Sequence, residues 1–495
     1  MLGTRRFTRR EALGLAAITG ATLLAGCSSQ GGSDSSATKA ASIGDDALSI
    51  LVKGYDWGPG VPAVLVSLPK EASSVEAKDV KVTTARVERT LSDVFLCDEN
   101  GEKVDGPASC VAFELETTNA VSGSPFRYDT TTLHNLWAPS YRVEVACDDL
   151  TIDGVSTSLD LSADCIDRRV CPETALFSNR SSFSGTYHND LLNQDDQLTL
   201  QTAAYEPPQL KASGKAPLVV WLNGQGEGGT DVDIELLGNK VVALAENRIQ
   251  SHFDSDGASG AFVLAVQTPT YWMDEGDGTN GNGSGVSRYT GILMDAVDAY
   301  VTSNPSVDAD RIYLGGCSNG GYMTMNMLVT YPDYWAAAYP VCQAYSYWEY
   351  ERDADGATGR SSVPTDKVWF TGEKVEKLKD IPIWMALSID DPVVNPLRYG
   401  LPDYRALVQA GAQNSWLSVF ESVKGSDDPT ATYIGHFSWI YLLNDEITHV
   451  QDRNAIAATS GTDDFGQVPS NDGGGSENAG EYDNLFDWLN AQSRE

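Results

Sequence analysis

The sequence predicts an α/β protein whose mostly parallel sheet is covered by helices and preceded by a small all-β domain. Over residues 48–195, short alternating or β-branched runs are separated by clusters of Gly, Pro, Asn and Asp. That pattern is typical of a small antiparallel sandwich, with an immunoglobulin-like arrangement as one option. Over residues 196–495, apolar runs alternate with helical spacings. Alternating strands and helices predict a parallel sheet with its functional groups at the carboxyl edge.

A lipoprotein signal peptide is predicted over residues 1–26. Paired arginines precede an apolar segment from Ala12 to Ala25, and small residues lead to Cys27. The apolar segment is shorter than a membrane span. We therefore expect export, for which the arginine pairs indicate the twin-arginine route, and lipid attachment at Cys27. Residues 27–47 predict a flexible tether, so the expected location is extracytoplasmic, with the lipid as the only membrane contact.

The most informative motif lies at residues 311–321. An apolar strand runs into Gly316-Cys317-Ser318-Asn319-Gly320, and a run with helical spacing follows. Glycines at both flanks suit a sharp strand-to-helix turn, where a side chain would clash with the strand or the helix. Ser318 is therefore the expected nucleophile, and the amide of Asn319, at the helix N-terminus, is expected to face the developing oxyanion.

A serine nucleophile needs a general base, and only His436 and His449 follow Ser318 in the chain. A serine hydroxyl is a poor nucleophile at neutral pH without such a neighbour. His436 lies at a glycine-containing junction between a loop and a helix, whereas His449 falls in a segment that we expect to be a helix with a surface histidine. The sequence therefore favours His436.

The acid that orients the base is expected at the end of the apolar run Ile381–Ile389, which has the length of a buried parallel strand. Asp390 and Asp391 follow it directly. Asp391 is favoured because an Asp-x-Val-Val turn often carries this acid. The alternative, Asp390, stays open, and at least one of the two is expected to cap the turn.

A second oxyanion donor is expected after the predicted strand 217–222. The glycine-rich run 223–229 follows this strand, and glycine lets a main-chain amide, that of Gln225 by expectation, approach a substrate oxygen. The run lacks the Gly-Lys-Ser/Thr ending of a nucleotide-binding P-loop.

With these motifs in this order, the second half of the chain resembles the α/β-hydrolases that include prolyl-oligopeptidase-like hydrolases and esterases of the polyhydroxybutyrate-depolymerase and feruloyl-esterase type. The matching segments are 217–229, 308–313, 316–321, 391–394, and His436 with Trp439. The resemblance implies an α/β-hydrolase fold and a Ser318-Asp391-His436 triad. It also implies cleavage of carboxylic esters through an acyl-enzyme, with neither cofactor nor metal.

One departure concerns the oxyanion loop, where such enzymes usually have His-Gly and this chain has Asn223-Gly224. Two alternatives to an esterase follow. A serine peptidase of prolyl-oligopeptidase-like type would use the same triad, although the preceding segment is too short for the long propeller of those enzymes. A non-catalytic surface lipoprotein that binds a ligand is the other, with Asn223 as its only support.

The net charge of −35 argues against nucleic acid as a partner, because phosphates need a basic surface. The expected partner is a small or polymer-linked ester, and the sequence predicts no oligomeric state. The glycine-rich loop 274–285 begins with acidic residues, but its spacing fits no EF-hand, so no metal site is predicted.

Aromatic and cysteine residues near the motifs lead to weaker expectations. Trp272, Tyr345 and Trp348 lie on predicted loops and could contact a flat substrate or pack under a lid. Cys317 and Cys342 end neighbouring predicted strands, where either a disulfide or two buried thiols would fit. For the all-β domain, spacing the enzyme from the membrane is the default expectation.

Overall fold

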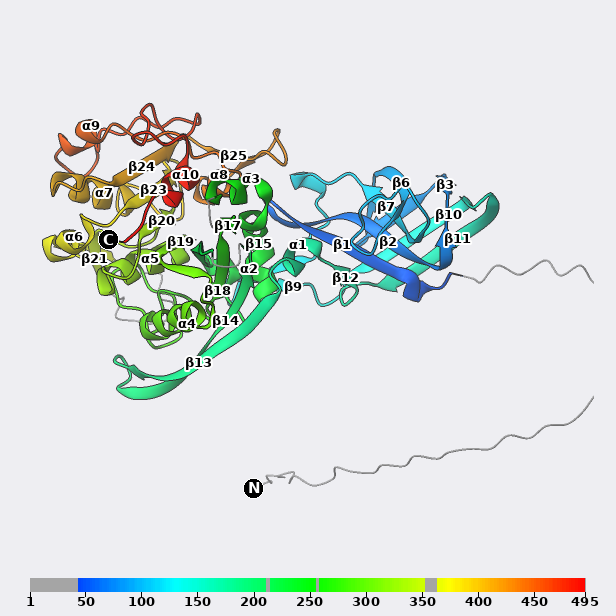
Figure 1. Ribbon diagram of the computed structural model, residues 1–495, viewed down its shortest axis with the longest axis horizontal. Helices are drawn as coiled ribbons and strands as arrows, with labels where there is room; N and C mark the ends of the chain where they lie inside the picture. Colours follow the sequence, from blue (N-terminus) through cyan, green and yellow to red (C-terminus); the bar gives the residue numbers. More distant parts are fainter. Residues whose placement is uncertain (1–42, 211–213, 255–257, 352–362, 495) are drawn as a thin grey trace, which may run out of the picture. The chain divides into compact units, whose positions relative to one another are not determined.

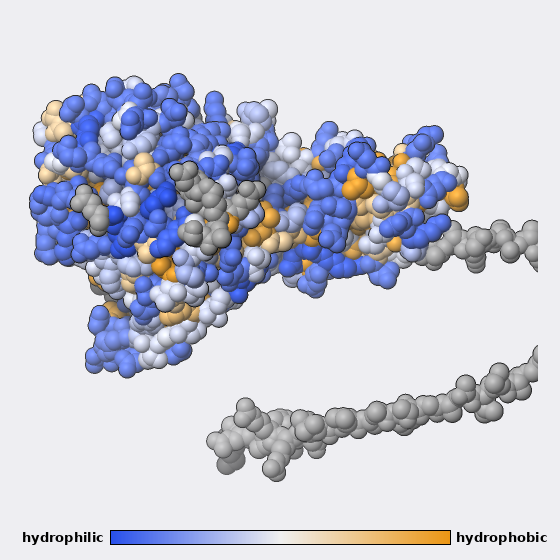
Figure 2. All heavy atoms as spheres, viewed as in Figure 1, coloured by the Kyte–Doolittle hydropathy of each residue, from blue (hydrophilic) through white to orange (hydrophobic). Residues whose placement is uncertain are grey.

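The computed structural model describes residues 43–210, 214–254, 258–351 and 363–494 (Figure 1). Ile43–Glu495 form one compact unit. The predicted signal peptide and Cys27 lie outside the described residues. Within the described ranges, no helix is both long and apolar enough to cross a membrane. Hydrophilic residues cover most of the face seen in Figure 2, in keeping with the net charge of −35.

The N-terminal domain consists of two facing sheets, with strand orders β12-β1-β2-β7-β6 and β11-β10-β4-β5 and with β3 paired to β10; the pairs are antiparallel except that β12 runs parallel to β1. The strands are β1 (Leu48–Tyr55), β2 (Gly58–Ala72), β3 (Val75–Lys78), β4 (Lys81–Thr84), β5 (Val87–Arg89), β6 (Leu91–Cys97), β7 (Ala108–Leu115), β10 (Arg142–Ile152), β11 (Val155–Asp164) and β12 (Arg169–Val170). Alternate residues of β10, such as Val143 and Val145, point into one shared core. A separate hairpin, β8 (Phe126–Asp129) with β9 (His134–Trp137), extends from this domain.

The second domain has an eight-stranded sheet in the order β13-β14-β18-β16-β19-β20-β23-β24. Its strands are β13 (Asn179–Asn189), β14 (Gln194–Tyr205), β16 (Ala216–Leu222), β18 (Phe262–Gln267), β19 (Val307–Cys317), β20 (Ala337–Val341), β23 (Ile383–Ser388) and β24 (Ser415–Phe420). The strands from β18 to β24 run parallel, while β13 and β14 are antiparallel additions at one edge. The expected α/β class is confirmed.

The predicted boundary at residue 195 needs a correction, because β13 belongs to the second domain. All eleven residues from Asn179 to Asn189 pair with β14. Most residues of β13 are exposed or half-buried. An exposed edge strand has the same alternating, polar composition as the strands of the N-terminal domain, so the sequence did not distinguish the two.

Helices cover both faces of the sheet, as the apolar strands require. Along β16, Leu218, Val220 and Leu222 pack in one core with α4, α5 and α7, whereas Val219 and Trp221 pack in the other with α2, α8 and α10. The helices are α1 (Pro172–Ala175), α2 (Val232–Gly238), α3 (Asn247–Gln250), α4 (Thr290–Ser303), α5 (Asn319–Thr330), α6 (Gly372–Leu378), α7 (Gly400–Gln409), α8 (Trp439–Leu443), α9 (Arg453–Ala457) and α10 (Leu485–Asn490). Short additional strands are β15 (Gln209–Leu210), β17 (Ala258–Ser259), β21 (Trp348–Glu351), β22 (Val363–Val368), β25 (Val423–Lys424) and β26 (Thr432–Tyr433).

A buried ion-pair network joins the N-terminal domain to the second domain. Lys240 Nζ lies 2.7 Å from Asp427 Oδ2 and 3.4 Å from Asp56 Oδ1, and it donates to Asn444 Oδ1 at 3.0 Å. Only 5% of Lys240 and 2% of Asp56 are exposed. Leu237 of α2 also packs into the core of the N-terminal domain. The interface between the two domains therefore combines an apolar contact of Leu237 with the buried ion pairs of Lys240.

The disulfide considered between Cys317 and Cys342 is not formed, and each of the seven described cysteines is a free thiol. The Cys317 thiol donates to Asn239 Oδ1 at 3.5 Å. Burial raises the thiol pKa of both Cys317 and Cys342. They are the two buried thiols that the sequence allowed as the alternative.

Candidate active site

Ser318 occupies the sharp turn between β19 and α5. Its backbone has φ 54° and ψ −110°, which is a strained conformation for a residue with a side chain. A Cβ on Gly320 or on Gly316 would collide with the carbonyl oxygen of Leu222. Glycine is thus required at both flanks, because the turn presses directly against the end of β16.

The structure brings Ser318, His436 and Asp391 together at the carboxyl edge of the sheet. His436 Nε2 lies 2.9 Å from Ser318 Oγ, and His436 Nδ1 lies 2.8 Å from Asp391 Oδ2. The other carboxylate oxygen of Asp391 accepts the amides of Val393 at 2.7 Å and Val394 at 2.9 Å. The acid therefore caps its own turn with one oxygen and holds the imidazole with the other. Both His436 and Asp391 are 7% exposed.

The two rejected candidates lie apart from this arrangement. Asp390 Oδ1 accepts the hydroxyl of Ser388 at 2.6 Å. His449 Nδ1 is 2.9 Å from Thr448 Oγ1. The expected helix around His449 is absent from the described chain there, because α8 ends at Leu443. Neither residue is hydrogen-bonded to Ser318 or His436.

The main-chain amides of Gln225 and Asn319 begin two different helical turns. Gln225 is the first residue of the 3₁₀ turn Gln225–Glu227, and Asn319 is the first residue of α5. First-turn amides have no acceptor within their own helix. Within the described part of the chain, no acceptor outside those helices is found for either amide. Both amides are therefore free to donate to a ligand.

Asn223, which stands where a histidine is usual, supports this loop. It is 1% exposed, its Nδ2 donates to the Gly224 carbonyl at 2.8 Å, and its Oδ1 accepts the Thr268 amide at 3.1 Å. The asparagine thereby fastens the start of the glycine-rich loop to the end of β18. A polar side chain with one donor and one acceptor serves this purpose.

The sequence analysis missed the contact between the N-terminal domain and the oxyanion loop. Asn135 of β9 donates from Nδ2 to Glu227 Oε1 at 3.0 Å, and Trp137 Nε1 donates to Asp231 Oδ2 at 2.8 Å. Burial raises the pKa of Glu227 to about 7. No local sequence signal joins residues so far apart in the chain, so only the folded structure reveals this support.

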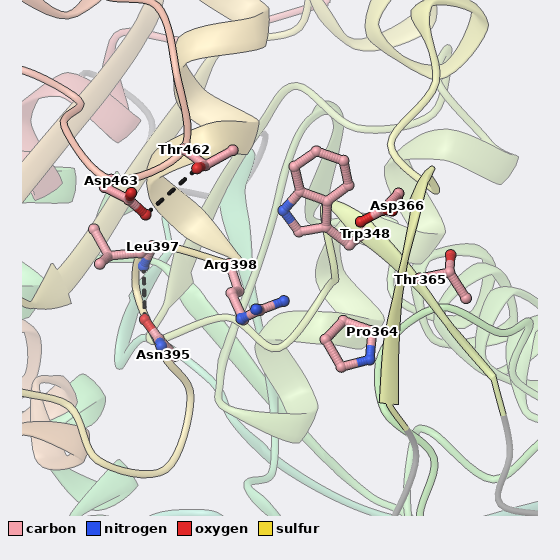
Figure 3. Close-up of a pocket in the computed structure, with 9 residues that line it drawn as sticks. All are labelled: Trp348, Pro364, Thr365, Asp366, Asn395, Leu397, Arg398, Thr462 and Asp463. Carbon is pink, nitrogen blue, oxygen red and sulfur yellow. Dashed lines mark hydrogen bonds between the residues drawn. The ribbon is translucent and has the colours of Figure 1, made fainter.

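A cavity of about 410 Å³ opens at the same edge of the sheet (Figure 3). One wall is Trp348, on the segment that follows β20, and another is Leu397 with Arg398, on the segment that follows Asp391. Figure 3 shows the indole of Trp348 and the guanidinium of Arg398 bordering the same space. Asp366 adds a carboxylate. The lining can therefore both stack on a ligand and hydrogen-bond to it.

Of the three aromatic candidates, only Trp348 lines this cavity. Trp272 is fully buried and packs edge-on against Tyr289 at 6.0 Å. Tyr345 is 1% exposed and stacks on Tyr322 at 5.7 Å. Trp272 and Tyr345 thus belong to the core under the site, and their expected substrate contact is corrected accordingly. From the sequence, an aromatic side chain on a predicted loop that packs in the core could not be distinguished from one that is accessible to a ligand.

In the described ranges, no group of three or more His, Cys, Asp or Glu side chains could hold a metal ion. At the start of the glycine-rich loop, Asp274 Oδ1 accepts the amides of Gly276 at 2.8 Å and Gly278 at 2.9 Å. Its other oxygen accepts the Thr270 hydroxyl and lies 3.4 Å from Arg288. The carboxylate is therefore engaged by protein donors.

Comparison with known proteins gives matches in both domains. The family described as "Esterase Ig-like N-terminal domain" matches residues 47–156, and the "Prolyl oligopeptidase family" matches residues 292–362. A poly(3-hydroxyalkanoate) depolymerase C of Paucimonas lemoignei is 39% identical over 70 residues, which are 14% of this chain and 16% of that protein. This chain therefore aligns with only a small part of that curated relative.

A solved structure described as a thermostable esterase resembles both domains together. The TM-score is 0.61 at 20% identity, and the match covers 90% of this chain and 100% of that chain. At this identity, the likeness establishes the fold. The comparisons thus confirm an α/β-hydrolase fold preceded by an immunoglobulin-like domain.

Proposed function

We propose that this protein is a serine hydrolase that cleaves carboxylic esters through an acyl-enzyme. The observation that carries the proposal is the continuous hydrogen-bonded relay from Ser318 Oγ through His436 to Asp391 Oδ2. Such a relay gives a serine hydroxyl a base and gives that base a fixed orientation.

In acylation, Ser318 Oγ attacks the ester carbonyl carbon while His436 Nε2 accepts the hydroxyl proton. Asp391 Oδ2 accepts a hydrogen bond from the Nδ1–H of His436 and stabilises the imidazolium that forms. The carbonyl oxygen becomes an oxyanion, which the amides of Gln225 and Asn319 are free to bind. When the tetrahedral intermediate collapses, His436 returns the proton to the leaving alcohol.

In deacylation, the same groups act on water. His436 Nε2 removes a proton from a water molecule, whose oxygen attacks the acyl carbonyl. The two amides again bind the oxyanion, and the collapse of this second intermediate releases the acid and returns the proton to Ser318. Every proton in the cycle passes through His436.

We assign the cavity beside Trp348 to the part of the substrate away from the scissile bond. The segment that carries Trp348 is hydrogen-bonded to the nucleophile turn, because the Ala344 amide donates to the Ser318 carbonyl at 3.1 Å. The same segment is joined to the opposite wall of the cavity, because the Tyr347 amide donates to the Arg398 carbonyl at 3.2 Å. Trp348→Ala should raise KM for aryl esters with large acyl groups more than for acetate esters. Equal effects on both would contradict the assignment.

A serine peptidase is the second candidate, favoured by the prolyl oligopeptidase match at residues 292–362. Matched p-nitrophenyl esters and peptide p-nitroanilides separate the two, since the released groups are similarly easy to follow. Under the ester proposal, the esters turn over and Ser318→Ala abolishes that turnover. Faster turnover of the anilides would favour the peptidase.

We also propose export and lipid attachment at Cys27, supported by the composition of residues 1–26. Growth of an expressing bacterium with a labelled fatty acid should label the wild-type protein and not Cys27→Ser. Equal labelling of both would contradict the lipid site, and an unlabelled protein retained in the cytoplasm would contradict export.

A further inference from the structure

The side chain of Asn280 bridges the side chains of Gln225 and Asn319, the two residues whose main-chain amides are proposed to bind the oxyanion. Asn280 Nδ2 donates to Gln225 Oε1, and Asn280 Oδ1 accepts Asn319 Nδ2 at 2.8 Å. Asn280 lies on the loop between β18 and α4, so it belongs to neither the glycine-rich loop nor the nucleophile turn. It is the element that joins them.

The direction of this chain of amides is set by a main-chain donor at one end. The Met273 amide donates to Asn319 Oδ1 at 3.2 Å, so the other group of that side chain must be the NH₂. Asn280 must then offer its oxygen to Asn319 and its NH₂ to Gln225. Asn280 and Asn319 each use one donor and one acceptor, and Gln225 accepts through Oε1, so none of the three can be reversed without losing a bond.

Asn280 is itself held firmly on both sides. The Gly281 amide donates to the Met273 carbonyl at 3.2 Å, and the Ser346 amide donates to the Gly283 carbonyl at 2.9 Å. Gly283 has φ +81°, and a Cβ there would collide with the carbonyl oxygen of Ala344. The backbone around Asn280 is therefore packed against the segment that follows β20.

We propose that Asn280 is a positioning residue that sets the distance between the amides of Gln225 and Asn319 so that both meet one oxyanion. The inference rests on the proposed function. Asn319 is held in position as the first residue of α5. Gln225 instead belongs to the glycine-rich run 223–229, and glycine allows the backbone more conformations than other residues do. Because Asn280 is hydrogen-bonded to both residues, it holds Gln225 of the loop at a fixed distance from Asn319 of α5.

A positioning role for Asn280 predicts a specific effect on kcat and KM. The oxyanion carries its full charge only in the tetrahedral states, so a misplaced donor weakens the transition state more than the bound ester. Loss of the bridge should lower kcat and leave KM nearly unchanged. A trifluoromethyl ketone, which adds to serine as a tetrahedral oxyanion, should bind more weakly by the same factor as kcat/KM falls.

The test is a double-mutant cycle with Asn280→Ala and Gln225→Ala in the full chain. Gln225→Ala removes the side chain but keeps the main-chain amide, so both single variants break the same link. Each should lose about tenfold to a hundredfold in kcat, less than removal of a whole donor costs. The double variant should lose no more than either single variant, because the link can be broken only once. Thr279→Ala removes a hydroxyl that donates to Asp277 Oδ1 at 2.6 Å within the loop; it is the matched control and should change neither value.

Additive losses in the double variant, or an unchanged inhibitor constant in Asn280→Ala, would overturn the positioning role. Ser318→Ala is measured in parallel. If that variant keeps full ester hydrolysis, or if wild type has none, the proposed function fails and the positioning role fails with it. If Ser318→Ala is inactive and Asn280→Ala behaves as wild type, only the positioning role fails.

Discussion

Replacement of Glu227 by glutamine tests the account of the oxyanion loop through protein stability. Glu227 is 6% exposed, it lies on the turn that begins with Gln225, and its carboxyl accepts Asn135 Nδ2 at 3.0 Å. Burial raises its pKa to about 7 from the ordinary 4.5. Below pH 7 the folded protein therefore holds a neutral carboxyl, which glutamine imitates in shape and keeps as an acceptor for Asn135.

The sign and size of the effect follow from proton linkage. Between pH 4.5 and 7 the unfolded chain releases the Glu227 proton while the folded protein keeps it, so wild type loses stability as the pH rises. A shift from 4.5 to about 7 corresponds to about 3 kcal/mol. Glu227→Gln has no such proton. Relative to wild type, its free energy of unfolding should rise by up to about 3 kcal/mol between pH 4 and pH 8.

Urea denaturation at pH 4, 6 and 8, followed by tryptophan fluorescence, measures this difference. Glu481→Gln removes the same formal charge from an exposed position and is the matched control with which Glu227→Gln is compared. A difference between Glu227→Gln and wild type that does not change with pH would refute the reasoning, because the buried carboxyl would then not retain its proton.

Three further predictions concern the Ser318-His436-Asp391 relay, the buried Lys240 and the half-buried His252. Asp391→Asn should lower kcat by about 10⁴-fold in ester hydrolysis, since the amide would favour the wrong tautomer of His436. Lys240→Met leaves Asp56 buried without its cation, and its free energy of unfolding in urea should fall by about 3 to 5 kcal/mol. Hydrogen bonding to Asp445 raises the pKa of His252 to about 9, so its stabilising effect is full below pH 6.5 and lost as the pH rises through 9. Thermal melts from pH 6 to 10 should show this loss in wild type and not in His252→Gln.

Much of the site could be predicted because its chemistry lies in local sequence. The strand-to-helix turn around Ser318 needs glycines at fixed positions, and a buried parallel strand such as β23 is a continuous apolar run. These constraints act within a few residues, so the chain displays them directly. In this fold the acid and the base follow the nucleophile in the chain, which left His436 and His449 as candidate bases and Asp390 and Asp391 as candidate acids.

What the sequence left open depends on side-chain direction and on distant contacts. The sequence favours Asp391 but leaves Asp390 open, and only the fold points Asp390 toward Ser388 and Asp391 toward His436. Trp272 and Trp348 both lie on loops predicted from the sequence, yet packing buries Trp272, whereas Trp348 begins β21 and lines a cavity.

The supports of the oxyanion loop were missed for the same reason. Asn135 and Asn280 are ordinary polar residues in the sequence, and their roles arise from hydrogen bonds to partners 92 and 55 residues away. The N-terminal domain therefore does more than act as a spacer, because it contacts the loop that carries Gln225.

The most direct test of the central claim, an activated Ser318, is labelling of the purified protein by a fluorophosphonate and location of the adduct by mass spectrometry. The relay through His436 predicts one adduct, on Ser318 Oγ, and no labelling of Ser318→Ala. Thr324→Ala, which removes the α5 hydroxyl that donates to the Gly320 carbonyl at 2.9 Å, is the control and should label as wild type does. An unlabelled wild type that is folded, or an adduct on another residue, would contradict the account.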